Sequence, residues 1–302
     1  MNKGSDLAAE KSHAAAVPTG SEEDDEILLI LAEQLGQMVI SGLVPGYRAL
    51  SILSILEKLA GVEETVVRDK AVESMNSVIP LLVGDGQSVR GKEEEEARQT
   101  CVRSAPGLLL AIVKRMAGSD WFTAKISSCS ILPCIYQFFN TMKSNDIVSA
   151  SDNGMGLEDG GGVAVEDIKL ELRNMFRTLA EDDTPMVRRS AGKNLGRYAE
   201  AVAQLPYGKK GGNSGPAAKE FIIPGGKDES TIKKTVSLDC KNKVLEDVVP
   251  IYQVLANDEQ DSVRLLAVSN SGSIGCALGL DGNLTSKVVL PIVKAHSADL
   301  SW

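Results

Sequence analysis

Few residues in this sequence of 302 have the type and spacing that chemistry requires. The densest group is the carboxylate run Glu93–Glu96, in a segment with glycines on both sides. Such a run could bind a metal ion or supply acids and bases, but a solvated charged segment is its commoner role. Gly154, Gly156 and Gly160–Gly162 could suggest a phosphate-binding loop, yet no strand precedes them and no Gly-Lys-Ser/Thr motif follows. We therefore predict a charged surface segment and a linker.

The cysteines and histidines form no catalytic or metal-binding pattern. The five cysteines are an odd number without a C-x-x-C pair, and Cys129 and Cys134 lie five residues apart, on different faces of a helix. The two histidines, His13 and His296, have no partner in the sequence that would complete a triad or a zinc site. We expect no enzyme, no cofactor and no metal. Unpaired cysteines favour a reducing compartment, the cytoplasm and also the nucleus.

Composition narrows the class of protein further. Hydrophobic residues make up 43% of the chain but aromatic residues only 4%, which favours thin helical layers of Leu, Ile, Val and Ala over an all-β fold. The net charge of −9 lacks the basic footprint of a nucleic-acid-binding protein. No apolar run approaches the roughly 18 residues of a membrane span, and the first twenty residues resemble neither a signal peptide nor a transit peptide. We expect neither nucleic acid nor a membrane as a partner.

The elements that position any functional residue repeat along the chain. Four segments share an apolar helix, a short polar turn, and a second helix that opens with a small or branched residue followed by a cation. They span 56–75, 113–132, 176–195 and 252–271, and the aligned cations are Arg68, Lys125, Arg188 and Arg264. The first copies are spaced about 40 residues apart, the length of a two-helix repeat. The pattern predicts an all-α protein with stacked helical pairs.

The recurring positions suit such pairs. Asp182 and Asp258 fall in the turn, where a carboxylate accepts hydrogen bonds from the amides that open a helix. Arg188 and Arg264 follow one turn into the second helix, close enough to pair with those carboxylates. We predict a HEAT-type α-α superhelical solenoid. Its structural repeat positions are Arg68, Lys125, Asp182, Arg188, Asp258 and Arg264.

The ends and the longer spacings complete the predicted organisation. A fifth copy of the pattern begins in 23–36, and a sixth starts near the end of the sequence, so the solenoid has about six repeats, of which the first and last are incomplete. Segments rich in Gly, Ser, Lys and Glu lengthen three spacings and are interpreted as disordered insertions between repeats. The predicted organisation is a disordered tail at 1–22 and a solenoid at 23–302 with insertions at about 84–107, 144–167 and 206–243.

The turn sequences resemble one family in particular. EDDEILLILAEQLG (23–36), EETVVRDKAVES (63–74), GSDWFTAK (118–125), DDTPMVRR (182–189) and DEQDSVRLLAV (258–268) are similar to the scaffold (A, 65 kDa regulatory) subunit of protein phosphatase 2A. The motifs differ from repeat to repeat and occur in family order, which makes the resemblance specific. The insertions and the Ala-rich tail depart from the family pattern. The resemblance covers the N-terminal portion of that family.

The resemblance implies a non-catalytic scaffold whose intra-repeat turns bind B-type regulatory subunits. In this family the catalytic subunit binds the last repeats, so we expect this chain not to recruit it. A HEAT or armadillo adaptor with another partner, such as a transport receptor, is the alternative. A third class is an enzyme with an unrecognised site.

Both tryptophans fall in predicted turns, where a binding role is more natural than a core role, although each could instead cap the apolar layer between helices. Arg189 points about 100° away from Arg188 on a helix, so Arg188 is expected to be structural and Arg189 to meet a partner. By resemblance, the predicted partner-binding residues are Trp121, Phe122, Asp183, Thr184, Pro185, Met186, Arg189, Glu259, Asp261 and Trp302.

Overall fold

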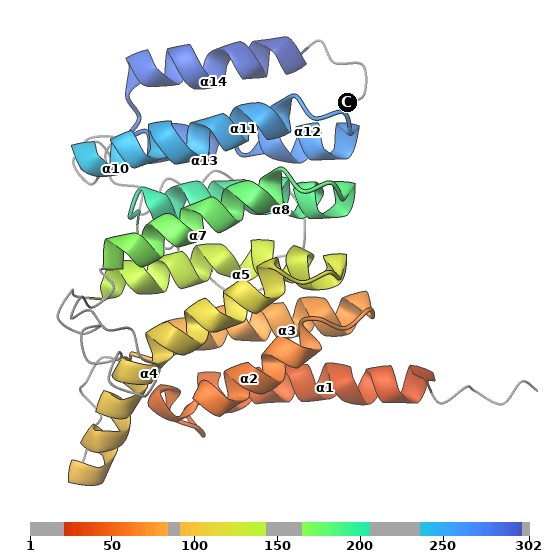
Figure 1. The fold of residues 1–302 in the computed structure, drawn as a ribbon, viewed down its shortest axis with the longest axis vertical. Coiled ribbons are helices and arrows are strands. Elements are labelled where there is room, and N and C mark those ends of the chain that lie inside the picture. The colour runs from red at the N-terminus through yellow and green to blue at the C-terminus, as the bar shows by residue number, and fades with distance from the viewer. Residues whose placement is uncertain (1–20, 84–90, 143–164, 206–235, 298–302) are drawn as a thin grey trace, which may run out of the picture.

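The computed structural model describes residues 21–83, 91–142, 165–205 and 236–297. Within these ranges all regular elements are helices and none is a strand. The helices stack in antiparallel pairs, one pair above the next, into an elongated column (Figure 1). The predicted all-α solenoid is confirmed. Among the described helices, none combines the length and the hydrophobicity of a membrane span.

Each pair contributes one helix to either side of the stack. The first helices are α2 (Leu50–Leu59), α4 (Lys92–Ala117), α7 (Val165–Ala180) and the run of α10 (Leu238–Lys243), η5 (a π-helix, Val244–Val248) and α11 (Val249–Ala256). The second helices are α1 (Ser21–Ile40), α3 (Thr65–Val78), α5 (Phe122–Thr141), α8 (Pro185–Val202) and α12 (Asp261–Ser269), which α13 (Ser271–Ala277) follows. Short 3-10 helices, η1 (Gly46–Arg48) and η2 (Ile79–Leu81), lie beside the second repeat, and α14 (Gly282–His296) packs on α13 and α11 at the end of the stack.

Apolar residues one helical turn apart form the core between the two sides. Val67, Ala71 and Met75 of α3 are fully buried, and so are Val187 and Ala191 at the same positions of α8. This spacing places the side chains on one face of each helix, which the first helices and the neighbouring second helices cover. The apolar period therefore fixes which face of each second helix points inward.

Side chains also hydrogen-bond each repeat to the one before it. A hydroxyl or amide on one second helix donates to a main-chain carbonyl of the preceding repeat. The pairs are Ser74 Oγ to Ala32 O (2.8 Å), Ser127 Oγ to Ala60 O (2.6 Å), Ser190 Oγ to Ile126 O (3.0 Å) and Asn270 Nδ2 to Gly192 O (2.9 Å). Because buried polar groups must be paired, these bonds fix the register between successive repeats.

The second part of the predicted 84–107 insertion differs from our interpretation. Residues 92–107 form the first half of α4, where three glutamates occupy the first turn and Glu95 makes a two-bond contact with Arg98. Acidic residues at the N-terminus complement the helix dipole, and Cys101 and Ala105 are buried against the stack. Hydrophobic contact and good helix formers thus order a segment that composition alone classed as a loop.

The other predicted insertions lie mostly outside the described residues. The residues that lie outside the described part at the three insertions are 84–90, 143–164 and 206–235, and the tail at 1–20 also lies outside it. The described edges of two insertions are helical, since 165–167 open α7 and 238–243 form α10. The first helices of those repeats therefore begin a few residues earlier than the sequence pattern indicated.

Gly196 provides a direct test of the close approach between α8 and the following repeat. An alanine Cβ at Gly196 would collide with Oδ1 of Asn270, which accepts a hydrogen bond from the Gly196 amide (3.1 Å). We expect Gly196→Ala to lower the free energy of unfolding by about 1–3 kcal/mol, the usual cost of overpacking. The matched control is Gly107→Ala on α4, where nothing lies within 4 Å of the added methyl and a gain of about 0.5–1 kcal/mol is expected. Urea titration followed by circular dichroism measures both, and equal effects would contradict the packing.

Candidate partner-binding surface

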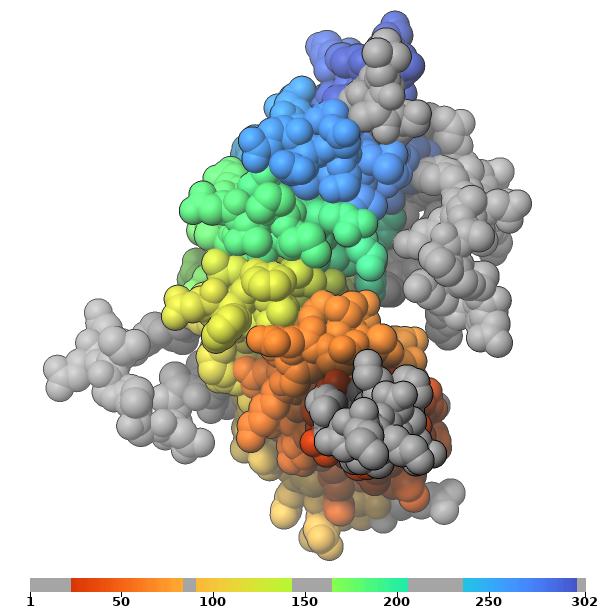
Figure 2. Space-filling model, turned by 90° about the vertical axis from the view of Figure 1, so that its right-hand side faces the viewer, coloured from red at the N-terminus to blue at the C-terminus, as the bar shows by residue number. Residues whose placement is uncertain are grey.

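The turns within the four complete pairs lie along one edge of the stack. They comprise residues 60–64, 118–121, 181–184 and 257–260, and we call them, with the first turn of each following helix, the turn ridge. The ridge runs along the right-hand edge of Figure 1 and faces the reader in Figure 2, where the repeats follow one another from bottom to top. A partner could therefore contact several repeats at once along this edge.

Large apolar side chains are exposed on three successive turns of the ridge. Val66 is 56% exposed, Trp121 67%, and Met186 49%, and Phe122 beside Trp121 is also exposed. Exposed apolar groups that follow one edge make that edge a candidate binding surface. Sequence reasoning singled out Trp121, Phe122 and Met186 but missed Val66. The alignment of the repeats could have indicated Val66, since Val66 and Met186 both lie two residues before the cation of their repeat.

The remaining predicted partner-binding residues add polar groups to the ridge. Asp183, Pro185 and Arg189 are exposed on the third turn, and Thr184 is half-buried as the residue before α8. On the fourth turn, Glu259 and Asp261 are exposed, but each forms an ion pair within the ridge: Glu259 with Arg188 (3.1 Å) and Asp261 with Arg264 (2.8 Å). Trp302 lies outside the described residues.

Where the cation of a repeat is an arginine, it closes its own turn. The guanidinium of Arg188 donates to the carbonyls of Asp182 and Asp183 (both 3.1 Å), six and five residues before it. Two other arginines make the equivalent pair of bonds: Arg68 to the carbonyls of Val62 and Glu63, and Arg264 to those of Asp258 and Glu259. These carbonyls follow the end of the first helix, where backbone acceptors lack helical partners. The cation therefore holds the turn in a fixed shape.

Two cations also link one turn to the next. Lys125 pairs with the carboxylate of Asp182 (2.8 Å), and Arg188 contacts the carboxylate of Asp258 through two nitrogens (2.7 and 3.2 Å). Burial raises the pKa of Asp182, but hydrogen bonds from Lys125 and Thr184 outweigh it and hold that pKa below its usual value. The hydrogen bond with Asp258 raises the pKa of Arg188. The ridge is thus preorganised by charge-assisted hydrogen bonds.

Arg188 and Arg189 differ as their positions on the helix suggest. The Arg188 side chain is 12% exposed and contacts the carbonyls of its own turn and the carboxylates of Asp258 and Glu259. The Arg189 side chain is exposed, and no hydrogen bond or ion pair holds it within the described part of the chain. Arg189 is therefore accessible to another molecule.

Comparisons with known proteins address the kind of partner. No family model matches the chain. The chain is 32% identical over 271 residues to a probable serine/threonine-protein phosphatase PP2A regulatory subunit of Caenorhabditis elegans, which covers 89% of this chain and 32% of that protein. It is 28% identical to the A-type regulatory subunit of protein phosphatase PP2A from Schizosaccharomyces pombe, over 98% of this chain and 37% of that protein. The beta isoform of the human 65 kDa A-type regulatory subunit of serine/threonine-protein phosphatase 2A is 33% identical over 200 residues, 65% of this chain and 26% of that protein.

This chain is a homologue of the A-type subunits of PP2A. The resemblance predicted from the turn sequences is therefore confirmed. The chain spans about a third of the length of the relatives that it matches. These relatives are named as regulatory rather than catalytic subunits, in agreement with the expectation that the chain is not an enzyme.

The cysteines of this A-type homologue have a packing role. All five are buried and free of disulfides. Burial raises the pKa of Cys129 and of Cys134 to about 12, which keeps both thiols protonated and unreactive. No group of three His, Cys, Asp or Glu side chains that could hold a metal ion occurs among the described residues.

Proposed function

We propose that the chain is a non-catalytic scaffold subunit of a PP2A-type phosphatase complex and that its turn ridge binds a B-type regulatory subunit. The observation that carries this proposal is the row of exposed apolar side chains, Val66, Trp121, Phe122 and Met186. Arg68 and Arg188 hold the turns of Val66 and Met186 in shape, and Lys125 links the turn of Trp121 to the next one through Asp182. An exposed aromatic side chain on a fixed backbone loses little conformational entropy on binding, which is typical of interface hot spots.

Homology to regulatory subunits supports the choice of partner. Polar residues around the apolar row, including the exposed Asp183 and Arg189, would form the rim that gives an interface its specificity. Five free, buried cysteines support an intracellular, cytoplasmic location.

Isothermal titration calorimetry of the purified chain with a purified B-type regulatory subunit tests the proposal. We expect saturable binding with one regulatory subunit per chain. Absence of binding at concentrations that saturate a full-length scaffold subunit would contradict the assignment of partner. A phosphatase assay with a phosphopeptide tests the non-catalytic role of the isolated chain. That role would be wrong if phosphatase activity co-purified with the chain in chromatography and changed when the chain was mutated.

A further inference from the structure

The first and last helices of the described stack each lack the helix that would complete their pair. Within the described residues, α1 has the place of a second helix but no first helix of its own repeat precedes it, and α14 has the place of a first helix but no second helix follows it. The two lie at opposite ends of the column (Figure 1). Each therefore has a face that a complete pair would cover.

A repeated hydrogen bond aligns α1 with the other second helices. Ser74 and Asn270 both lie six residues after the cation of their repeat, and each donates to a carbonyl of the preceding second helix, Ala32 O and Gly192 O respectively. Gly192 lies four residues after the cation of its own repeat. Ala32 therefore marks the same place in α1, and Leu28 occupies the place of the cation.

The apolar residues that α1 exposes occupy positions that are buried in the complete pairs. Ile27 and Leu31 of α1 correspond to Val67 and Ala71 of α3, which are 1% and 0% exposed. Ile27 is instead 62% and Leu31 39% exposed, and Ile30, on the same side of the helix, is 52% exposed. The exposed stripe of α1 is thus the part of a second helix that its first helix would help to bury.

The other open helix shows the converse. The motif Val-x-Pro-Ile-x occurs both in η5–α11 and in α14 and aligns the two first helices. Val249 and Tyr252, in the variable places of the motif, are 6% and 0% exposed, whereas Leu290 and Val293, in the same places of α14, are 43% and 38% exposed. The exposed stripe of α14 is thus the part of a first helix that its second helix would help to bury.

The two open helices carry opposite charges. The sequence of α1 has six carboxylates and no lysine or arginine, whereas that of α14 has two lysines and no carboxylate. Second helices begin at the turn ridge and first helices end there, so Glu23 and Asp24 of α1 and Lys294 of α14 lie at the same edge of the column (Figure 1). All three are exposed. The two stripes are therefore complementary in charge as well as in their place in a repeat.

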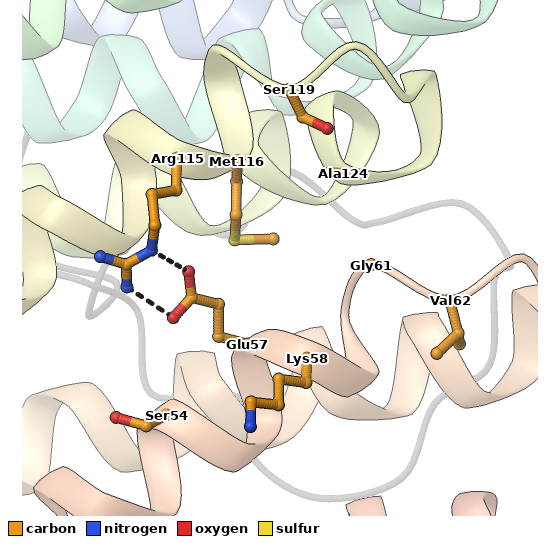
Figure 3. A pocket seen from close by; sticks show the side chains of 9 residues that line it. All are labelled: Ser54, Glu57, Lys58, Gly61, Val62, Arg115, Met116, Ser119 and Ala124. Carbon is orange, nitrogen blue, oxygen red and sulfur yellow. Dashed lines mark hydrogen bonds and ion pairs between the residues drawn. The ribbon is translucent and has the colours of Figure 1, made fainter.

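Opposite charges already link neighbouring first helices within the stack. Arg115 of α4 contacts the carboxylate of Glu57 on α2 through two nitrogens (2.8 and 2.7 Å; Figure 3), and Lys114 of α4 pairs with Glu171 of α7 (2.7 Å). Charge pairs of this kind fix which surfaces meet and in which register more than they add to affinity. Lysines of α14 and carboxylates of α1 can do the same between two molecules.

We propose that this chain binds a second copy of itself head to tail, so that α14 of one copy packs on α1 of the next as the first helix that α1 lacks. The apolar stripes would cover each other, and the lysines of α14 would meet the carboxylates at the start of α1. Because two different surfaces meet, the contact is heterologous, and it adds copies along the column axis instead of closing at a dimer. The inference does not depend on the partner at the turn ridge.

Analytical ultracentrifugation of the chain alone tests the inference. We expect the average mass to rise with concentration beyond that of a dimer. Leu290→Asp, which places a carboxylate in the apolar stripe opposite the acidic α1, should weaken self-association at least about tenfold. The matched control is Leu238→Asp, at a residue of α10 that is 75% exposed and outside both stripes, and it should leave self-association unchanged.

Charge reversal distinguishes a head-to-tail contact from a symmetric one. One variant combines Lys287→Glu with Lys294→Glu, and the other combines Glu23→Lys with Asp24→Lys. Each alone brings like charges together and should weaken self-association about tenfold. An equimolar mixture should assemble again, because the acidic α14 of the first variant meets the basic α1 of the second.

Circular dichroism checks that each variant keeps its helix content, and if a charge-reversed variant does not, Leu290→Asp and its control decide alone. The inference is overturned if the chain stays a monomer at every concentration, as it would if its own residues 1–20 covered α1. It is also overturned if assembly stops at a dimer, if Leu290→Asp assembles as the wild type does, or if the mixture of folded charge-reversed variants fails to assemble.

Discussion

Replacing Trp121 by alanine will weaken regulatory-subunit binding about 30- to 1,000-fold, which corresponds to roughly 2–4 kcal/mol of binding free energy. The indole is 67% exposed on the second complete turn of the ridge, so it can bury a large apolar area only against another molecule. Helix content should not change, because the residue opens α5 without entering the core. Calorimetry with a B-type partner measures the affinity and circular dichroism the helix content.

Leu43→Ala provides the matched control for this variant. Leu43 is 74% exposed but lies in the connection between the first two repeats, outside the turn ridge. Its truncation should leave the affinity unchanged within about twofold, since an exposed residue outside an interface contributes little. The ridge would be the wrong surface if Leu43→Ala weakened binding as much as Trp121→Ala.

The sequence predicted the part of this fold that repeats. An apolar face returns every turn of a second helix, and a cation follows one turn after its start, so Arg68, Arg188 and Arg264 could be aligned before any contact was known. Their bonds to carbonyls six and five residues earlier explain why the spacing recurs. A geometry enforced by the backbone leaves a pattern in the sequence.

Features that depend on contacts between distant residues were harder to predict. Composition assigned 92–107 to a loop, because four glutamates and several polar residues outweigh the few apolar ones that anchor α4. Its buried Cys101 donates to Leu82 O (3.6 Å), a contact with the preceding repeat that the local sequence does not indicate. The π-helix at Val244–Val248 likewise has no signal in the apolar pattern.

The candidate surface was predicted better than its supporting contacts. Turn position indicated Trp121, and the resemblance to the scaffold family indicated Met186; both are exposed, as a turn of a solenoid is by construction. Lys125, aligned with the arginines, was expected to act as they do, yet the contact that the structure gives it is the ion pair to Asp182 of the next turn. An ammonium lacks the planar fork with which a guanidinium reaches two carbonyls at once.

Arg188→Ala will lower the free energy of unfolding by about 3 kcal/mol, whereas Arg189→Ala will change it by less than about 0.5 kcal/mol. The side chain of Asp258 is only 5% exposed, so removing Arg188 leaves a nearly buried carboxylate without its cation and leaves two turn carbonyls without a donor. Arg189 has no such contacts within the described residues. Urea titrations of the two variants, which differ by one position and remove the same side chain, measure the contrast.

Arg188→Lys separates charge from geometry in the same experiment. A lysine keeps the positive charge but cannot contact the Asp258 carboxylate and both carbonyls of its own turn together. We therefore expect the stability of Arg188→Lys to lie between that of the wild type and that of Arg188→Ala.

In the calorimetric assay, Arg189→Ala should weaken regulatory-subunit binding about fivefold or more while the chain stays fully folded. If Arg189→Ala instead unfolded the chain and Arg188→Ala affected binding alone, the turn would be held by a different residue from the one that the hydrogen bonds indicate.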